Sequence, residues 1–460
     1  MDGKGKRFAD ENSKITRISF EQSKENPEPK RDNQDKRLKE KNAKELEKLL
    51  KKNKRNVIRA QHKELTDEDT PSEQPKVEKR AAKKTNYNKF IVTAIIMVLL
   101  FAVVFSVLNL DKLTLNNISN FIQYGVLNQQ GDERFPLDVT GESISAGNFI
   151  RMGQDVCYSS DTKTQRLNNY GMPLFTAQHA FINPTLTVGD KGALVYNLGG
   201  TGYQLVYNDG TVYSGEAENN ILVADFADNG VYAIVTQSSG YLSKLYVYDE
   251  KNEQIFAYSF ADYYVTSVSL NSSGERVAVS GVSALDGVNI ASMYILDFTK
   301  DAPLYFSELE NNIIYEVKYL GDKYACAIGR SASYVMNTYN GEIVNNDYEG
   351  RALTAYHINS DTNTYTLSLS NSGDGRNCDI ISYSANGSED KAFSVDEKII
   401  SLSTYKSRVA LLSGDCVLLY SKDGRFVSEK ELNSDPHAVV LYTTSNAYVL
   451  CTGYIDSVSL

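Results

Sequence analysis

The sequence has no tryptophan, four histidines and five cysteines among its 460 residues, and each scarcity excludes a class of site. The histidines His62, His179, His357 and His437 stand apart, without the His-x-x-x-His or His-Glu spacing that is typical of zinc sites. Without tryptophan, the chain has neither the Asp-box pattern of sialidases nor an indole ring for a quinone cofactor to stack on. We therefore expect no metal and no cofactor.

Short motifs of catalysis are also missing. There is no Gly-x-Ser-x-Gly elbow and no Gly-x-x-x-x-Gly-Lys loop. The segments 361–363 and 374–375 resemble parts of calcium loops but lack the required spacing and the closing glutamate. We expect a protein that is not an enzyme; the alternative is a hydrolase or lyase that acts on a surface glycan through aspartates and tyrosines at the rim of the fold.

All five cysteines lie after residue 150. Cys157, Cys326 and Cys451 fall on equivalent strands of different repeats, which would separate them by more than the ~7 Å between Cα atoms that a disulfide can bridge. We expect buried free thiols that behave as small apolar side chains. The alternative is one disulfide between Cys378 and Cys416, which open corresponding strands in adjacent repeats.

No charged residue occurs from residue 90 to residue 108. A helix rises ~1.5 Å per residue, so this stretch reaches ~30 Å and can cross the hydrocarbon core of a bilayer. Basic residues crowd its N-terminal flank, which predicts a cytoplasmic N-terminus and an extracellular C-terminal domain at the plasma membrane. A cleaved signal peptide and a buried soluble helix are the rival interpretations. The flanking residues expected at the membrane surface are Lys76, Lys79, Arg80, Lys83, Lys84 and Lys89.

These features divide the chain into four parts: a cytoplasmic tail (1–88), a transmembrane helix (89–110), a connector (111–134) and an outer domain (135–460). The tail carries an excess of Lys and Arg, whereas the outer domain is acidic enough to give the chain a net charge of −10. The tail is too polar to form a core, and we expect it to be mostly disordered, with a charged helix at about 35–65. A coiled coil there is the alternative. The tail should be attracted to the lipid bilayer, and the outer domain should repel nucleic acid.

The outer domain shows short alternating runs of apolar residues, rich in the chain's 31 tyrosines, and no helical periodicity. A hairpin with a polar tip recurs along it, and a third and a fourth strand follow most copies. Asn-Gly and Asp-Gly pairs at 209–210, 340–341, 386–387 and 423–424 suit the tight turns between those later strands. The eight copies of the hairpin are at 149–160, 186–197, 223–237, 267–281, 316–329, 355–370, 401–414 and 440–453.

The copies follow one another at intervals of about 37–48 residues, the period of a four-stranded propeller blade. We therefore predict an all-β fold, an eight-bladed β-propeller, or a seven-bladed one if the degenerate first copy is not a full blade. The last copy ends after three strands, and residues 135–139 can supply the fourth and so close the ring. A pair of β-sandwiches is the rival fold, but it would not explain a regular period.

The block 272–281, followed by Met293-Tyr294-Ile295-Leu296-Asp297-Phe298, resembles a repeat of WD40/YVTN-type and quinoprotein-like propellers, although no Trp-Asp dipeptide is present. The plan of basic tail, single anchor and acidic propeller is similar to a bacterial family of membrane-anchored propellers of unknown function, domain-of-unknown-function family 5711. Segments 183–184, 241–243 and 283–287 resemble recurrent segments of that family. The resemblance implies fold and location and carries no activity.

We expect the function to reside in loops at one face of the propeller, where a rigid scaffold can vary. The longest loop is expected at 280–291. Arginines on an acidic rim suit an anionic sugar, a peptide carboxylate or an acidic loop of a partner. The leading hypothesis is a binding or scaffolding module for a protein or a cell-envelope polymer; a single-pass transmembrane sensor is a variant. The candidate binding residues are Tyr241, Asp286, Arg330 and Arg376.

Overall fold

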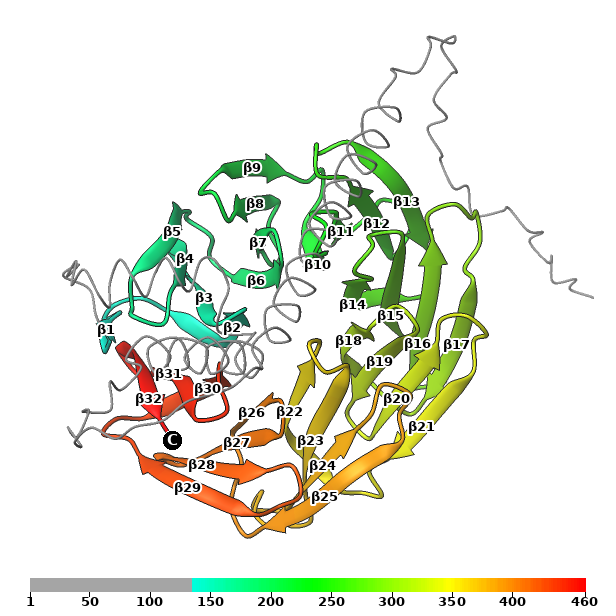
Figure 1. The fold of residues 1–460 in the computed structure, drawn as a ribbon. Helices are drawn as coiled ribbons and strands as arrows, with labels where there is room; N and C mark the ends of the chain where they lie inside the picture. Colours follow the sequence, from blue (N-terminus) through cyan, green and yellow to red (C-terminus); the bar gives the residue numbers. More distant parts are fainter. Residues whose placement is uncertain (1–134) are drawn as a thin grey trace, which may run out of the picture. The chain divides into compact units, whose positions relative to one another are not determined.

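The structure is a computed structural model that describes residues 135–460, and these residues form eight four-stranded antiparallel sheets set around a common axis (Figure 1). The predicted tail, transmembrane helix and connector, with the lysines and the arginine expected at the membrane surface, lie outside the described residues. Among the residues that are described, none belongs to a helix with the length and apolar character needed to cross a membrane.

Each sheet is one blade, and its strands follow one another outward from the axis. The innermost strands are β2 (Ile144–Met152), β6 (Pro184–Gly189), β10 (Ile221–Phe226), β14 (Tyr264–Leu270), β18 (Ile314–Leu320), β22 (Ala352–Asn359), β26 (Ser401–Tyr405) and β30 (Pro436–Leu441). The second strands are β3 (Asp155–Ser160), β7 (Gly192–Asn197), β11 (Tyr232–Thr236), β15 (Arg276–Leu285), β19 (Tyr324–Gly329), β23 (Thr364–Ser370), β27 (Arg408–Ser413) and β31 (Asn446–Cys451).

The outer half of each blade completes the sheet. The third strands are β4 (Lys163–Leu167), β8 (Gly202–Tyr207), β12 (Ser243–Tyr248), β16 (Val288–Asp297), β20 (Ala332–Asn337), β24 (Cys378–Tyr383), β28 (Cys416–Ser421) and β32 (Tyr454–Ser459). The outermost strands are β5 (Pro173–Gln178), β9 (Val212–Glu216), β13 (Gln254–Phe260), β17 (Tyr305–Glu310), β21 (Ile343–Asp347), β25 (Glu389–Val395), β29 (Phe426–Glu431) and β1 (Leu137–Asp138). We number the blades 1 to 8 in the order of their innermost strands.

The ring closes as the sequence predicted. Strand β1, from the start of the domain, pairs with β32 near the C-terminus, with Leu137 opposite Ile455 and Asp138 opposite Tyr454. The next residue continues the pairing, because the Val139 N–H donates to the Gly453 carbonyl over 2.9 Å. The eight-bladed prediction is therefore confirmed, and the degenerate first copy forms a full blade.

The turns that join third to fourth strands contain the predicted Asn-Gly and Asp-Gly pairs. In all four, only the glycine has a positive φ; in the turn after β8, φ of Gly210 is 84°. The Gly210 N–H donates to the Tyr207 carbonyl, and the Asp209 carboxylate accepts from the Thr211 N–H. This is the geometry of a type I turn followed by a left-handed residue, so glycine is needed at one of the two positions only.

The hydrophobic core lies between the blades. The eight clusters of buried side chains each join two neighbouring blades, one cluster at every interface of the ring. Tyrosine takes the place of the missing tryptophan as the large aromatic residue of these clusters. The largest fully buried aromatic side chains are Tyr158, Tyr232, Tyr348, Tyr365 and Tyr448.

The five cysteines are free, and four of them are buried, as expected. Burial raises the pKa of Cys157 to about 12. The alternative disulfide between Cys378 and Cys416 is wrong: Cys378 is buried within its blade, whereas Cys416 is partly exposed beside Asp415.

The segment 280–291, expected as a long loop, is instead a hairpin. Strands β15 and β16 pair continuously out to Leu285 opposite Val288. The flanking strands stop earlier, because the last partners of β14 and β17 are Val282 and Ile290. The tip is a two-residue turn in which Asp286 and Gly287 both have positive φ, 51° and 82°, as a type I′ turn requires. A two-stranded arm therefore extends beyond blade 4.

Candidate binding surface around one end of the ring axis

The two faces of the ring carry different loops. One face holds the turns between second and third strands and the connections from each blade to the next; we call it the connector face. The other face holds the turns between first and second and between third and fourth strands. Every innermost strand starts at the connector face, so its first residues surround that end of the axis (Figure 1).

A β-bulge recurs near the start of the innermost strands. The register between first and second strand shifts by one residue in five blades, and a longer irregularity occurs at 145–148 in blade 1. A bulge leaves one residue unpaired and changes the direction of its side chain. No local pattern in the sequence predicts this feature, because a bulge depends on strand pairing. The bulged residues are Leu222, Thr266, Tyr315, Thr354 and His437.

Some bulged side chains bond within their own blade. The hydroxyls of Thr266 and Thr354 each share a hydrogen bond with a serine hydroxyl of the second strand, over 3.1 and 2.8 Å. His437 Nε2 lies 2.8 Å from the hydroxyl of Thr452. Tyr315 is different, because its side chain remains 50% exposed.

Exposed large apolar side chains gather on the connector face. Tyr264 begins β14 and is 54% exposed, next to the blade that carries Tyr315. In the loops of the opposite face only one such residue occurs among those described, Tyr339, and the others lie on outermost strands and on no loop. The full set on the connector face is Ile182, Leu198, Tyr241, Tyr264, Val288, Tyr315 and Ile400.

The four residues selected from the sequence all lie on this face. Tyr241, Asp286, Arg330 and Arg376 occupy the turns between second and third strands in blades 3, 4, 5 and 6, so four successive blades contribute one each. All four are exposed. The structure thus places them on one side of the ring, and their role in binding stays a prediction.

At the other end of the axis, side chains reach across the interior of the ring. Arg151 of β2 forms an ion pair with Asp361, in the turn after β22, although two blades separate them along the ring. The guanidinium also lies 5.4 Å from the ring centroid of Tyr405 in β26 and donates to the Gly153 carbonyl over 2.8 Å. Blades 1, 6 and 7 are linked at this end.

His357 lies beside this ion pair and is bonded to the next blade. Its Nδ1 is 3.0 Å from the hydroxyl of Thr404 in β26. Burial, and then the charge of Arg151, lower the pKa of His357 to about 4, so the ring is neutral near pH 7. His357 is therefore a structural residue with its hydrogen bond satisfied.

A second ion pair joins blades 3 and 5 across blade 4. The Asp225 side chain is 5% exposed, and its carboxylate accepts from Lys318 Nζ, from the Thr187 hydroxyl and from the Leu270 N–H, over 3.0, 3.0 and 2.8 Å. Burial alone would lower the pKa of Lys318, but the carboxylates of Asp225 and Glu316 outweigh it and raise that pKa. The lysine is therefore charged, and four innermost strands meet at this carboxylate.

Short polar side chains also accept hydrogen bonds from backbone N–H groups on the innermost strand of the next blade. Ser267 and Ser269 accept from the Val317 and Tyr319 N–H groups, over 2.9 and 3.2 Å. Ser401 and Ser403 do the same for Val439 and Leu441. The Ser-x-Ser spacing in two innermost strands was the available signal in the sequence, and it points to structure.

No group of three or more His, Cys, Asp or Glu side chains is arranged to hold a metal ion within residues 135–460.

Comparison with known proteins agrees with the fold. A family model described as "Family of unknown function (DUF5711)" matches residues 137–460. No curated protein matches the chain significantly. The C-terminal WD40 domain of Sif2 is similar with a TM-score of 0.51 at 10% identity, over 71% of this chain and 97% of that one.

Two further solved structures cover 71% of this chain and 100% of their own. BamB from Moraxella catarrhalis is 11% identical with a TM-score of 0.46. Sqt1 from Chaetomium thermophilum, bound to the N-terminus of the ribosomal protein L10, is 10% identical with a TM-score of 0.48. At 10% identity, the likeness to the Sif2 domain establishes a shared propeller fold alone.

Proposed function

The chain belongs to the DUF5711 family of unknown function, and on the geometry of its propeller we propose that it is a membrane-tethered, extracytoplasmic module that docks a protein through its connector face. The observation that carries this proposal is the uneven distribution of exposed apolar side chains. Among the described residues, the loops of the connector face hold four, Ile182, Leu198, Tyr241 and Ile400, and the loops of the opposite face hold one, Tyr339. On the innermost strands, the two exposed ones, Tyr264 and Tyr315, also lie at the connector-face end.

The chemistry of this face suits a protein partner. Tyrosine and arginine dominate the energy of protein interfaces, since they bury a large area and keep a polar group at its edge. Tyr264 and Tyr315 begin neighbouring innermost strands, and Arg330 lies in the same blade as Tyr315. Two half-exposed tyrosines on rigid strands form a preorganised centre, with the arm of blade 4 beside it.

The tether and the location are part of the proposal. The uncharged segment 90–108 and the basic residues before it support a single-pass anchor at the plasma membrane with the propeller outside. An epitope placed after Leu460 should be accessible on intact spheroplasts, and one placed before Met1 only after permeabilisation. The reverse pattern would contradict this orientation.

On this proposal the propeller binds and does not catalyse, and its acidic character keeps nucleic acid away. The docking itself is tested by crosslinking in intact membranes and purification of the full chain. The double variant Tyr264→Ser/Tyr315→Ser should lose the specific crosslinked partner, whereas Tyr339→Ser, on the opposite face, should retain it. Equal recovery from both variants would refute docking through the connector face.

A further inference from the structure

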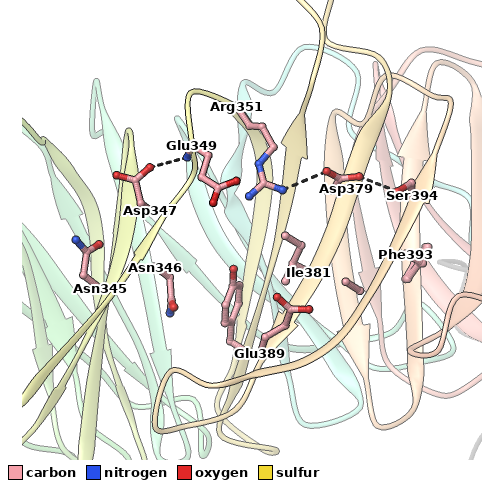
Figure 2. A pocket seen from close by; sticks show the side chains of 12 residues that line it. Asn345, Asn346, Asp347, Glu349, Arg351, Asp379, Ile381, Glu389, Phe393 and Ser394 are labelled. Carbon is pink, nitrogen blue, oxygen red and sulfur yellow. Dashed lines mark hydrogen bonds and ion pairs between the residues drawn. The ribbon is translucent and has the colours of Figure 1, made fainter.

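A groove of about 580 Å³ lies on the outer side of the ring between blades 5 and 6 (Figure 2). It is separate from the tyrosines of the proposed docking surface, because β21, β24 and β25 supply most of its walls. Its lining residues are Asn345, Asn346, Asp347, Glu349, Arg351, Asp379, Ile381, Tyr383, Glu389, Ala392, Phe393 and Ser394.

The one basic residue of the groove is already engaged. Arg351 donates to the Asp379 carboxylate over 3.1 Å and to the Tyr348 carbonyl over 2.8 Å. Asp379 also accepts from Asn371 and Ser394, over 2.9 and 2.7 Å. Burial raises the pKa of Asp379, but these three donors outweigh it, and the net effect lowers that pKa. This corner of the groove is complete without a ligand.

Three carboxylates of the groove remain, and that of Asp347 accepts from the Glu349 N–H. Glu349 and Glu389 enter the groove from the connector after β21 and from the start of β25, and both are exposed. In the part of the chain that the structure describes, neither forms an ion pair. Figure 2 shows Glu349 beside Arg351, and Glu389 below them. The groove therefore presents three carboxylates outside any ion pair of the described residues, and those of Glu349 and Glu389 accept no hydrogen bond from them either.

Tyr383 supplies an independent sign of a ligand. Its side chain is 6% exposed and lines the groove, yet its hydroxyl has no hydrogen-bond partner among the described residues. Its ring is held by stacking on Tyr365, with centroids 4.8 Å apart. Burial, and then the charge of Glu389, raise the pKa of Tyr383, so the hydroxyl stays neutral. The hydroxyl itself is not fully buried and opens onto the groove, where a molecule bound there can take up its hydrogen bond.

We propose that this groove binds a basic peptide, with the ammonium or guanidinium group of one side chain seated between Glu349, Glu389 and the Tyr383 hydroxyl. Lysine and arginine heads carry donors only, which matches three acceptors. The aliphatic stem of such a side chain packs well on apolar surface, and Ile381 and its cross-strand neighbour Ala392 provide it here. The same chemistry would accept a polyamine, so the test separates the two sources.

The test measures binding to the full chain in neutral-lipid nanodiscs, with an acetylated, amidated tri-arginine peptide and with spermidine as probes. We expect saturable, salt-sensitive binding of the peptide, at least tenfold tighter than that of spermidine. Tyr383→Phe should weaken peptide binding about tenfold and leave the thermal unfolding midpoint unchanged, because the hydroxyl has no partner to lose. Glu349→Gln/Glu389→Gln should weaken peptide binding further, and Glu431→Gln, an exposed glutamate of blade 7, should not change it.

Three results would overturn the proposal: no saturable binding of the peptide, tighter binding of spermidine than of the peptide, or an equal loss in the Glu431→Gln control. The outcome is independent of docking at the connector face. Tyr264→Ser/Tyr315→Ser should leave peptide binding unchanged, so failure of one proposal is distinguishable from failure of the other.

Discussion

Removal of the lysine from the buried ion pair is expected to destabilise the ring strongly. In Lys318→Met, the Asp225 carboxylate keeps the Thr187 hydroxyl and the Leu270 N–H but loses its charged donor. Loss of one partner from a buried pair costs about 3–5 kcal/mol. Because the Lys318 side chain is 29% exposed and Asp225 retains two donors, we expect a cost at or just below the lower limit of that range, about 2–3 kcal/mol.

The chain contains a matched control. Lys191 and Glu250 also form an ion pair between two blades, here the adjacent blades 2 and 3, at 2.6 Å, but their side chains are 47% and 57% exposed. Lys191→Met should therefore cost about 0–1 kcal/mol. Urea unfolding followed by tyrosine fluorescence measures both variants. If Lys318→Met costs no more than Lys191→Met, the buried carboxylate does not depend on its lysine. The double variant Asp225→Asn/Lys318→Met should be more stable than Lys318→Met alone, because position 225 no longer carries an unpaired buried charge.

Three further predictions follow from single positions. The pKa of His357 is lowered from 6.5 to about 4 in the folded chain. The contribution of this histidine to the free energy of unfolding is therefore complete above pH 6.5 and is lost as the pH falls from 6.5 to 4, by up to about 3 kcal/mol. His357→Asn should flatten the pH dependence of the unfolding free energy, and His437→Asn should not. A thiol reagent should label at most Cys416 in the folded chain and all five cysteines after denaturation, since the other four are buried; rapid labelling of Cys157 without denaturant would contradict this. Gly192→Ala would place a Cβ 2.3 Å from the Val206 carbonyl oxygen and should lower the unfolding free energy by about 2–4 kcal/mol. Gly147→Ala, where no atom lies within 4 Å of the added Cβ, should be near neutral. Equal stability of the two variants would show that the backbone yields at Gly192.

The fold was predictable because blade formation depends on local pattern. The alternation of apolar residues and the Asn-Gly and Asp-Gly turns repeat in each blade, and these determine hairpins one at a time. The closure by residues 135–139 followed from a count of strands, since a ring with an open edge would expose two unpaired strands. The separation of Cys157, Cys326 and Cys451 on different blades followed from the same count of strands.

The site was less predictable because it depends on pairing between distant segments. Arg151 and Asp361 are 210 positions apart, and nothing local in the sequence marks them as partners. The bulge at Tyr315 appears only when β18 is paired with β19. The arm at 283–289 was interpreted as a loop, because small and polar residues outnumber apolar ones there, although Asp286-Gly287 is a hairpin signal.

The most direct test of docking through the connector face is photo-crosslinking in the native host. Benzoylphenylalanine replaces Tyr315 in one strain and Tyr339 in another, so both probes are exposed but lie on opposite faces. The proposal predicts that irradiation yields a discrete protein adduct from position 315 and none from position 339. An adduct from position 339 alone, or none from either position, would contradict it.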